Sequence, residues 1–313
     1  MKNTIYELYN IQIGILIKLS DHVYKVKSID NEEYILKYIK DYDNLEATYS
    51  RLAILNISSF LIPIQNVYGQ YISNKDEAYF QLSKYYNDEL IQAKDMRLKF
   101  YLKELSFLHN KSQYYMKVND GFFEETYDYV IDNLEKAKQE LNDILFRIEA
   151  LDYKSPSSWL LLMNNQLFFQ AIDEAKKHIE KFLDLSKELK QLRVSLIYQN
   201  FDYQHIILKS SKIISTEKMC IAPPIYDLKY LFDYSFNGSI DLSGFIKEYL
   251  DSFTLLEYEK EWLLGLLFIP SFNFKALEGY KELEAIVAIT RSIQHFKNAF
   301  ELEKLLTQDE WKK

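Results

Sequence analysis

Residues 197–208 read Ile-Tyr-Gln-Asn-Phe-Asp-Tyr-Gln-His-Ile-Ile-Leu, a polar stretch between two apolar runs. Val194–Tyr198 and Ile206–Leu208 have the composition of short β-strands, and the residues between them have the composition of a loop. After residue 95 most of the chain has a different pattern, in which apolar residues recur at intervals of about 3.6 residues. A polar loop between short strands therefore interrupts a region that is otherwise predicted to be helical.

Helix patterns lie on both sides of this loop. Upstream, apolar residues at helical spacing predict one helix ending near Ser112 and two long helices that together occupy about residues 123–190. Downstream, Ala222-Pro-Pro224 predicts a rigid loop, and two or three further helices complete the chain. Residues 86–313 are therefore expected to form a large, mostly helical region.

The first 85 residues have strand patterns and one helix pattern. Strands are predicted at Ile11–Lys18, Val23–Lys27, Tyr34–Lys37, Ile64–Ile72 and Ala78–Leu82. Residues 43–55 have helical spacing, with Asp43 or Asn44 at the N-cap position. The sequence therefore predicts an α+β fold, in which residues 1–85 form a small antiparallel five-stranded sheet with one helix.

Composition excludes several classes of function. The chain has 313 residues, a net charge of −8 and no basic block, so nucleic acid is not expected as a partner. The single cysteine, Cys220, rules out an intramolecular disulfide and a cysteine-cluster metal site. The apolar run Trp262–Pro270 is much shorter than the roughly 20 residues that a membrane-spanning helix needs. No signal peptide is recognised at Met1–Asn10, so a cytoplasmic protein is expected.

The order of these segments resembles that of protein kinases and of aminoglycoside or choline phosphotransferases. Residues 197–208 are similar to the catalytic loop H-G-D-x-x-x-x-N and its following strand. Ile213-Ile-Ser-Thr-Glu217 stands where the metal-binding I-D-F-D/E segment of those proteins would be. The resemblance implies a protein-kinase-like two-lobe fold, with the lobes at residues 1–85 and 86–313.

Further segments agree with this resemblance. Tyr34-Ile-Leu-Lys37 is similar to the third strand, whose lysine holds the nucleotide phosphates, and Glu46 stands where the carboxylate partner of that lysine would be. Leu105–Ser112 resembles the helix that leads into the core, and Pro224-Ile-Tyr-Asp-Leu228 resembles the P-x-x-D-L that follows the metal segment. The two long helices and Leu263–Pro270 are similar to the spore-coat CotS-like and YutH-like branch of the superfamily.

The resemblance also implies a phosphoryl-transfer site in which three positions are changed. Asn200 stands in place of the catalytic carboxylate, His205 in place of a magnesium-binding asparagine, and Ser215 in place of the metal-binding aspartate. An amide is a poor proton acceptor, and Mg²⁺ prefers hard oxygen ligands. Asp202 and Glu217 lie close enough in sequence to supply carboxylates from a rearranged loop. Otherwise both are ordinary surface residues.

The nucleotide-binding positions are partly kept. Lys37 and Glu46 either form the ion pair that holds nucleotide phosphates or are ordinary surface residues. The turn Leu19-Ser-Asp-His22 lacks the glycines that let backbone amides approach a phosphate. ATP and Mg²⁺ are the cofactors that a functional site would use, and a degenerate site would need none. His178 and the other remaining histidines show no metal-ligand spacing in the sequence.

The sequence leaves three functions possible. The leading hypothesis is a catalytically degenerate kinase-like protein, a pseudokinase, with a structural or interaction role. The branch resemblance implies a spore-coat location with coat proteins as partners, and the fold implies a nucleotide or small-molecule ligand between the lobes. The alternatives are an active ATP-dependent small-molecule phosphotransferase and a helical scaffold unrelated to kinases.

Overall fold

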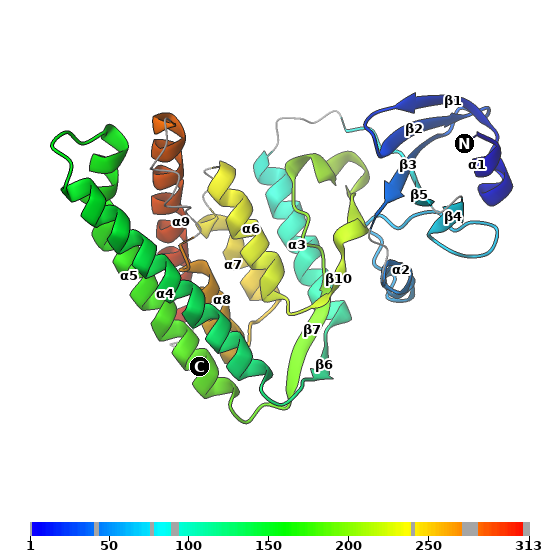
Figure 1. Cartoon of the computed structure of the whole chain (residues 1–313). Coiled ribbons are helices and arrows are strands. Elements are labelled where there is room, and N and C mark those ends of the chain that lie inside the picture. The colour runs from blue at the N-terminus through cyan, green and yellow to red at the C-terminus, as the bar shows by residue number, and fades with distance from the viewer. Residues whose placement is uncertain are drawn as a thin grey trace. The chain divides into compact units, whose positions relative to one another are not determined.

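The computed structural model of the chain describes residues 2–40, 44–75, 78–88, 94–238, 242–270 and 281–308. The chain consists of two compact units. The first unit comprises residues 1–113 and 194–222, and the second comprises residues 114–193 and 223–313. Figure 1 labels their elements along the chain. The predicted lobe boundary near residue 85 stays a prediction.

The first unit contains the predicted five-stranded antiparallel sheet. Its strands are β1 (Ile13–Lys18), β2 (Val23–Ser28), β3 (Glu33–Ile39), β4 (Ser73–Lys75) and β5 (Ala78–Lys84). Their order across the sheet is β1-β2-β3-β5-β4. Leu36 pairs with Tyr24 on one side and with Leu82 on the other, which fixes the register of the central strand β3. The sheet rules out the scaffold alternative, which predicted no such sheet.

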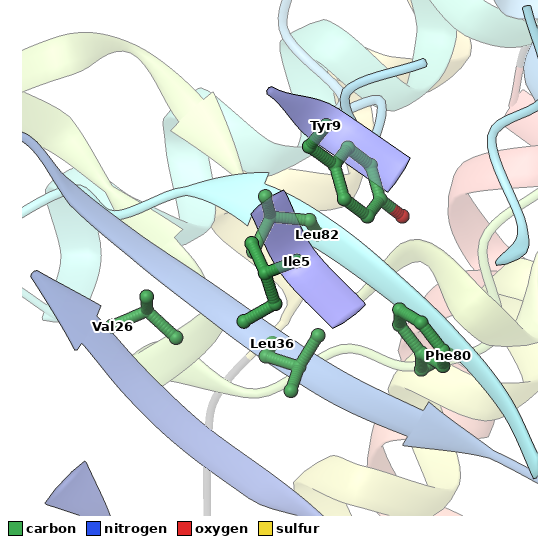
Figure 2. Close-up of a cluster of buried hydrophobic side chains, with 6 residues drawn as sticks. All are labelled: Ile5, Tyr9, Val26, Leu36, Phe80 and Leu82. Carbon is green, nitrogen blue, oxygen red and sulfur yellow. The ribbon is translucent and has the colours of Figure 1, made fainter. Parts of the chain in front are cut away.

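An N-terminal helix that the sequence did not predict covers one face of this sheet. Helix α1 (Lys2–Tyr9) places Ile5 and Tyr9 against Val26, Leu36 and Leu82 of the strands, as Figure 2 shows. Burying a side chain of this size contributes about 1.5–3 kcal/mol, so the contacts with the sheet stabilise a helix too short to form alone. Because side chains alternate along a strand, the neighbours of Leu36 face the opposite side of the sheet.

Helix α2 (Leu45–Ile54) forms where the sequence predicts it, but the segment after it differs from the prediction. Asn44 occupies the N-cap position in a left-handed conformation without a side-chain hydrogen bond, and Asp43 lies outside the described residues. The sequence predicts a strand at residues 64–72, where the structure has irregular backbone with a turn closed between Asn66 and Gln70. The Asn66 side chain accepts hydrogen bonds from the amides of Tyr68 (2.9 Å) and Gln70 (3.0 Å), which closes this turn and confines β4 to the next three residues.

The rest of the first unit carries the polar loop that the sequence singled out. It consists of α3 (Lys94–Ser112), most of β7 (Gln191–Ile197), β8 (Ile206–Ile207), β9 (Lys212–Ile213), β10 (Cys220–Ala222) and three short 3₁₀ turns at residues 203–205, 208–210 and 216–218. The buried guanidinium of Arg97 on α3 donates to the carbonyl oxygens of Tyr203 (2.7 Å) and Ile206 (2.8 Å). Ser112, at the end of α3, accepts a hydrogen bond from the amide of Leu196 (2.9 Å). Helix α3 therefore holds both ends of the loop.

The second unit is a helical assembly. Its elements are β6 (Tyr114–Lys117), α4 (Phe122–Glu149), α5 (Pro156–Ser186), α6 (Ile225–Gly238), α7 (Ser243–Ser252), α8 (Glu257–Leu267) and α9 (Glu282–Gln308). Helix α5 begins at Pro156 after an N-cap hydrogen bond from the Ser158 amide to Ser155 and packs against α4, α8 and α9 (Figure 1). A Cβ atom at Gly265 of α8 would lie 3.4 Å from Ile179 of α5, so these two helices approach closely. In the described part of the chain, no helix is long and apolar enough to cross a membrane.

A buried ion pair links β7 to α8 within the second unit, and we predict that it is a major source of stability there. Arg193 donates to Glu259, whose side chain is fully buried and also accepts from the amide of Leu256 (2.9 Å). We expect Glu259→Ala to lower the free energy of unfolding by about 3–5 kcal/mol, because the buried guanidinium loses the carboxylate that balances its charge. Denaturation in urea can be followed by fluorescence, since Trp159 of α5 and Trp262 of α8 belong to the second unit.

Glu257 provides the matched control for this substitution. It lies on the same helix, is exposed and pairs only with neighbouring Lys260 among the described residues. Glu257→Ala is expected to change the free energy of unfolding by about 0.5 kcal/mol at most. Equal losses in the two variants would contradict the role assigned to the buried pair.

Candidate functional site

A pocket of about 210 Å³ lies on the face of the sheet opposite α1, entirely within the first unit. One wall consists of side chains from β2, β3 and β5, and the other consists of residues 214–217. The lining residues are Val23, Ile35, Lys37, Leu61, Pro63, Gln81, Ser83, Lys84, Tyr85, Tyr86, Ile214, Ser215, Thr216 and Glu217. The alternation along β3 explains why Lys37 enters this pocket while Leu36 enters the core.

Lys37 and Glu217 form an ion pair at the polar end of the pocket. Their side chains are 26% and 18% exposed, so the pair is largely shielded from water. The second carboxylate oxygen of Glu217, Oε2, is buried and has no hydrogen-bond partner among the described residues. The resemblance implied that Lys37 would pair with Glu46, and the structure pairs it with Glu217 instead.

Glu46 has a different role. Its carboxylate accepts hydrogen bonds from the backbone amides of Tyr71 (2.9 and 3.1 Å) and Ile72 (3.0 Å). These amides precede β4, so Glu46 ties helix α2 to the edge of the sheet. Its acceptor capacity is therefore used within the fold and does not orient Lys37.

The residues at the three changed positions lie together and bond to one another. The Asn200 side chain is buried, and its Nδ2 donates to the carbonyl oxygen of Ser215 (2.8 Å). Nδ1 of His205 lies 2.8 Å from the carbonyl oxygen of Asn200, so Nδ1 is the protonated nitrogen in this contact. The hydroxyl of Tyr198 donates to the carbonyl oxygen of Ile214 (2.6 Å). These bonds join residues 198–205 to residues 214–215.

Backbone strain is concentrated at this junction. Ser215 has φ 59° and ψ 51°, and Gln199 has φ 47°, so both adopt the left-handed conformation that costs a non-glycine residue roughly 1–2 kcal/mol. Thr216 follows and donates to the carbonyl oxygen of Leu61 (2.7 Å). The strained conformation at Ser215 directs its carbonyl group to Asn200, and the surrounding hydrogen bonds maintain it.

Asp202 lies beside the junction and caps a 3₁₀ turn. Its side chain is half-buried and accepts from the amide of Gln204 (2.8 Å). The amide of His205 also bonds to the Asp202 carbonyl oxygen (3.0 Å). The sequence did not reveal this capping role. The cap explains why an acidic residue occupies this position even if the residue has no catalytic role.

Two backbone amides of the turn at residues 19–22 are used inside the turn. The amides of Leu19 and Ser20 both donate to the carbonyl oxygen of Val23, at 2.9 and 3.1 Å. Asp21 at the tip forms an ion pair with Lys18 (2.8 Å). Phosphate binding by such a turn requires free amides that point at the ligand, so this turn is a poor phosphate cradle.

Two residues near the pocket, Tyr49 and Tyr85, were not identified from the sequence. Tyr49 of α2 donates to Oε1 of Gln81 (2.9 Å), and burial raises the pKa of its hydroxyl, which therefore keeps its proton. Tyr85 lies at the pocket rim directly after β5, and the side chain of Lys25 stands 3.8 Å from the centre of its ring. Neither has a local sequence signal, because each acquires its role from residues distant along the chain.

The site fits a flat, partly apolar ligand better than a magnesium triphosphate. Val23, Ile35 and Leu61 provide apolar walls. Among the described pocket residues Glu217 carries the only carboxylate, and Lys37 neutralises it. Mg²⁺ needs several oxygen ligands in near-octahedral geometry. The described residues of the pocket do not supply that set.

Solved structures share this architecture. An aminoglycoside phosphotransferase from Alicyclobacillus acidocaldarius superposes with a TM-score of 0.70 over 96% of this chain and 94% of its own, at 10% sequence identity. The chain has a protein-kinase-like two-lobe fold. The AMP complex of spectinomycin phosphotransferase gives a TM-score of 0.56 at 14% identity over 96% of each chain. The complex of that enzyme with ADP and spectinomycin gives 0.53 at 12% identity, over 96% of this chain and 97% of the enzyme.

The sequence comparisons yield no further assignment. No protein-family model and no curated protein matches this chain. At these sequence identities the structural matches establish the fold but not the activity. The activity has to be inferred from the residues of the site.

The Asn200–Ser215 hydrogen bond can be tested by restoring the carboxylate. We predict that Asn200→Asp destabilises the loop by about 1–3 kcal/mol, because a carboxylate in place of the amide donor faces the Ser215 carbonyl oxygen. Hydrogen–deuterium exchange of residues 198–217 is expected to become faster. Asp202→Asn is the matched control, since asparagine keeps the capping acceptor. Unchanged exchange in Asn200→Asp would show that the bond does not organise the loop.

Proposed function

We propose that this protein is a catalytically degenerate member of the kinase fold that acts through binding rather than phosphoryl transfer. The observation that carries the proposal is the hydrogen bond from the buried Asn200 amide to the Ser215 carbonyl oxygen. By the resemblance, these two residues stand where a transferase has its catalytic base and its metal-binding aspartate.

The chemistry of phosphoryl transfer supports this proposal. The reaction requires a carboxylate near the acceptor hydroxyl and metal ions that neutralise the developing charge. Here an amide and a carbonyl group satisfy each other, and His205 contributes a protonated Nδ1 to the same cluster. None of the oxygen atoms of Asn200, His205 and Ser215 belongs to a carboxylate, so we assign the contacts among these residues a role in stability.

The pocket beside Lys37 supports a binding role. It keeps apolar walls and a lysine, and its carboxylate, Glu217, retains one buried oxygen without a hydrogen-bond partner in the described part of the chain. A ligand with a flat apolar part and a hydrogen-bond donor would match these groups. The spore-coat location with coat proteins as partners is part of the proposal and rests on the CotS-like and YutH-like resemblance alone.

We predict that the protein neither binds ATP in a magnesium-dependent manner nor hydrolyses it. Isothermal titration calorimetry with ATP, in Mg²⁺ and in EDTA, should give the same weak or absent heat, because the site lacks the oxygen ligands for the metal. A phosphate-release assay run on the same sample should stay at background. Magnesium-dependent binding together with phosphate release would contradict the proposal.

The alternative, an active small-molecule phosphotransferase, is favoured by one observation, the presence of Glu217 beside Lys37 in the pocket. In this version Asp202 would act as the base after the loop rearranges. If turnover is detected, Asp202→Asn should abolish it, because the substitution removes the proton acceptor and keeps the cap. Unchanged turnover in that variant would exclude Asp202 as the base.

A further inference from the structure

A buried histidine in the second unit lies between carboxylates of two other helices. His178 of α5 is 2% exposed. Its Nδ1 lies 2.6 Å from Oε2 of Glu261 on α8, and its Nε2 lies 3.2 Å from Oε1 of Glu303 on α9. The ring therefore connects three helices of one unit through both of its nitrogens.

A third carboxylate completes the cluster. Glu174 lies one turn before His178 on α5, so the two side chains project from the same face of the helix. One carboxylate oxygen of Glu174, one of Glu303 and a ring nitrogen of His178 all lie within 4.8 Å of one another. The imidazole is held in place by stacking on Phe268, with ring centroids 5.9 Å apart and planes 7° from parallel.

The orientation of the ring leaves one nitrogen for a ligand. In the tautomer in which Nδ1 donates to Glu261, Nε2 presents a lone pair on the side of Glu303. A metal ion held there would accept electron pairs from both atoms. The ammonium of Lys177 stands at the edge, 2.6 Å from Glu174 and 3.9 Å from Glu303, and its side chain is half exposed, so water could solvate the ammonium if a metal ion displaced it.

We propose that Glu174, His178 and Glu303 form a binding site for a divalent transition metal ion, for which Zn²⁺ is the best match. Zn²⁺ binds through one imidazole nitrogen and carboxylate oxygens at about 2.0–2.2 Å, and it accepts a set of three protein ligands with water in the fourth position. Two ligands of a tetrahedral ion at these bond lengths lie about 3.3 Å apart. Nε2 of His178 and Oε1 of Glu303 are already 3.2 Å apart, and the Glu174 oxygen, within 4.8 Å, has to move closer.

Glu261 is the positioning residue of this site. A histidine that ligates a metal almost always donates its other N–H group to a carboxylate, a backbone carbonyl group or water, which fixes the tautomer and the orientation of the ring. The 2.6 Å contact between Nδ1 and Glu261 is that arrangement. Bound metal would take the place of the Lys177 ammonium between Glu174 and Glu303 and would join α5 to α9.

The site should prefer zinc to the hard alkaline-earth ions. Imidazole is a ligand for Zn²⁺ and its neighbours in the periodic table, whereas Mg²⁺ and Ca²⁺ take oxygen ligands almost exclusively. Weak binding of all divalent ions alike would instead indicate attraction to acidic surface groups. Selectivity therefore separates a built site from a cluster of negative charge.

Metal binding can be measured on the full chain after treatment with EDTA. Titration calorimetry with ZnCl₂ is expected to give one equivalent of tight binding, with no displacement by excess Mg²⁺. Co²⁺ should give the visible absorption of a tetrahedral site. Glu303→Gln should weaken Zn²⁺ binding by about 100-fold or more, and Glu261→Gln by about 10- to 100-fold. The control Glu301→Gln, which alters an exposed residue of α9 that pairs with Lys304, should leave binding unchanged.

Lys177→Ala tests the site through an expected increase in Zn²⁺ affinity. If the ammonium competes with the metal, its removal should tighten Zn²⁺ binding, whereas a purely structural ion network would lose stability and gain no affinity. The inference is overturned if the wild-type protein binds no Zn²⁺, or if Glu303→Gln and Glu301→Gln bind it equally. Circular dichroism of each variant confirms that it is folded before its titration is interpreted.

Discussion

The hydrogen bond between the Asn200 side chain and the Ser215 carbonyl group is the constraint that organises the first unit. A buried amide donor without an acceptor would be costly, so the loop after β7 and the segment after β9 must stay in contact. The contacts of His205 and Tyr198 support the same junction, and Arg97 holds the loop from the side of α3. The polar side chains of this loop are thus used in contacts inside the first unit.

The sheet and the long helices could be predicted because their signals are local. Alternation and helical spacing identify β2, β3, β5, α3, α4 and α5 within a few residues. Helix α1 could not be predicted, since eight residues form a stable helix only when Ile5 and Tyr9 meet strands that lie far along the chain. Residues 64–72 look like a strand by composition, and the capping of the turn by Asn66 decides otherwise.

The candidate site could be predicted only in part, for the same physical reason. Segment order drew attention to Lys37, Asn200 and Ser215, and the structure brings Lys37 and Ser215 to one pocket with Asn200 bonded behind them. Which carboxylate pairs with Lys37 depends on which carboxylate accepts hydrogen bonds from the backbone amides of Tyr71 and Ile72. No local sequence pattern shows that contact. The sequence did not single out His178, because Glu174 alone, four residues before it, is a common helix spacing, and Glu261 and Glu303 come from two other helices.

The alternation along β3 couples the interior of the first unit to its pocket. Leu36 belongs to the core under α1, while Ile35 and Lys37 line the pocket on the other face. A shift of this strand by one residue would exchange an ammonium group with a core leucine. An insertion or deletion of one residue within β3 would therefore remove Lys37 from the pocket and place it against α1, whereas a change in the length of the turn before the strand would leave this alternation intact.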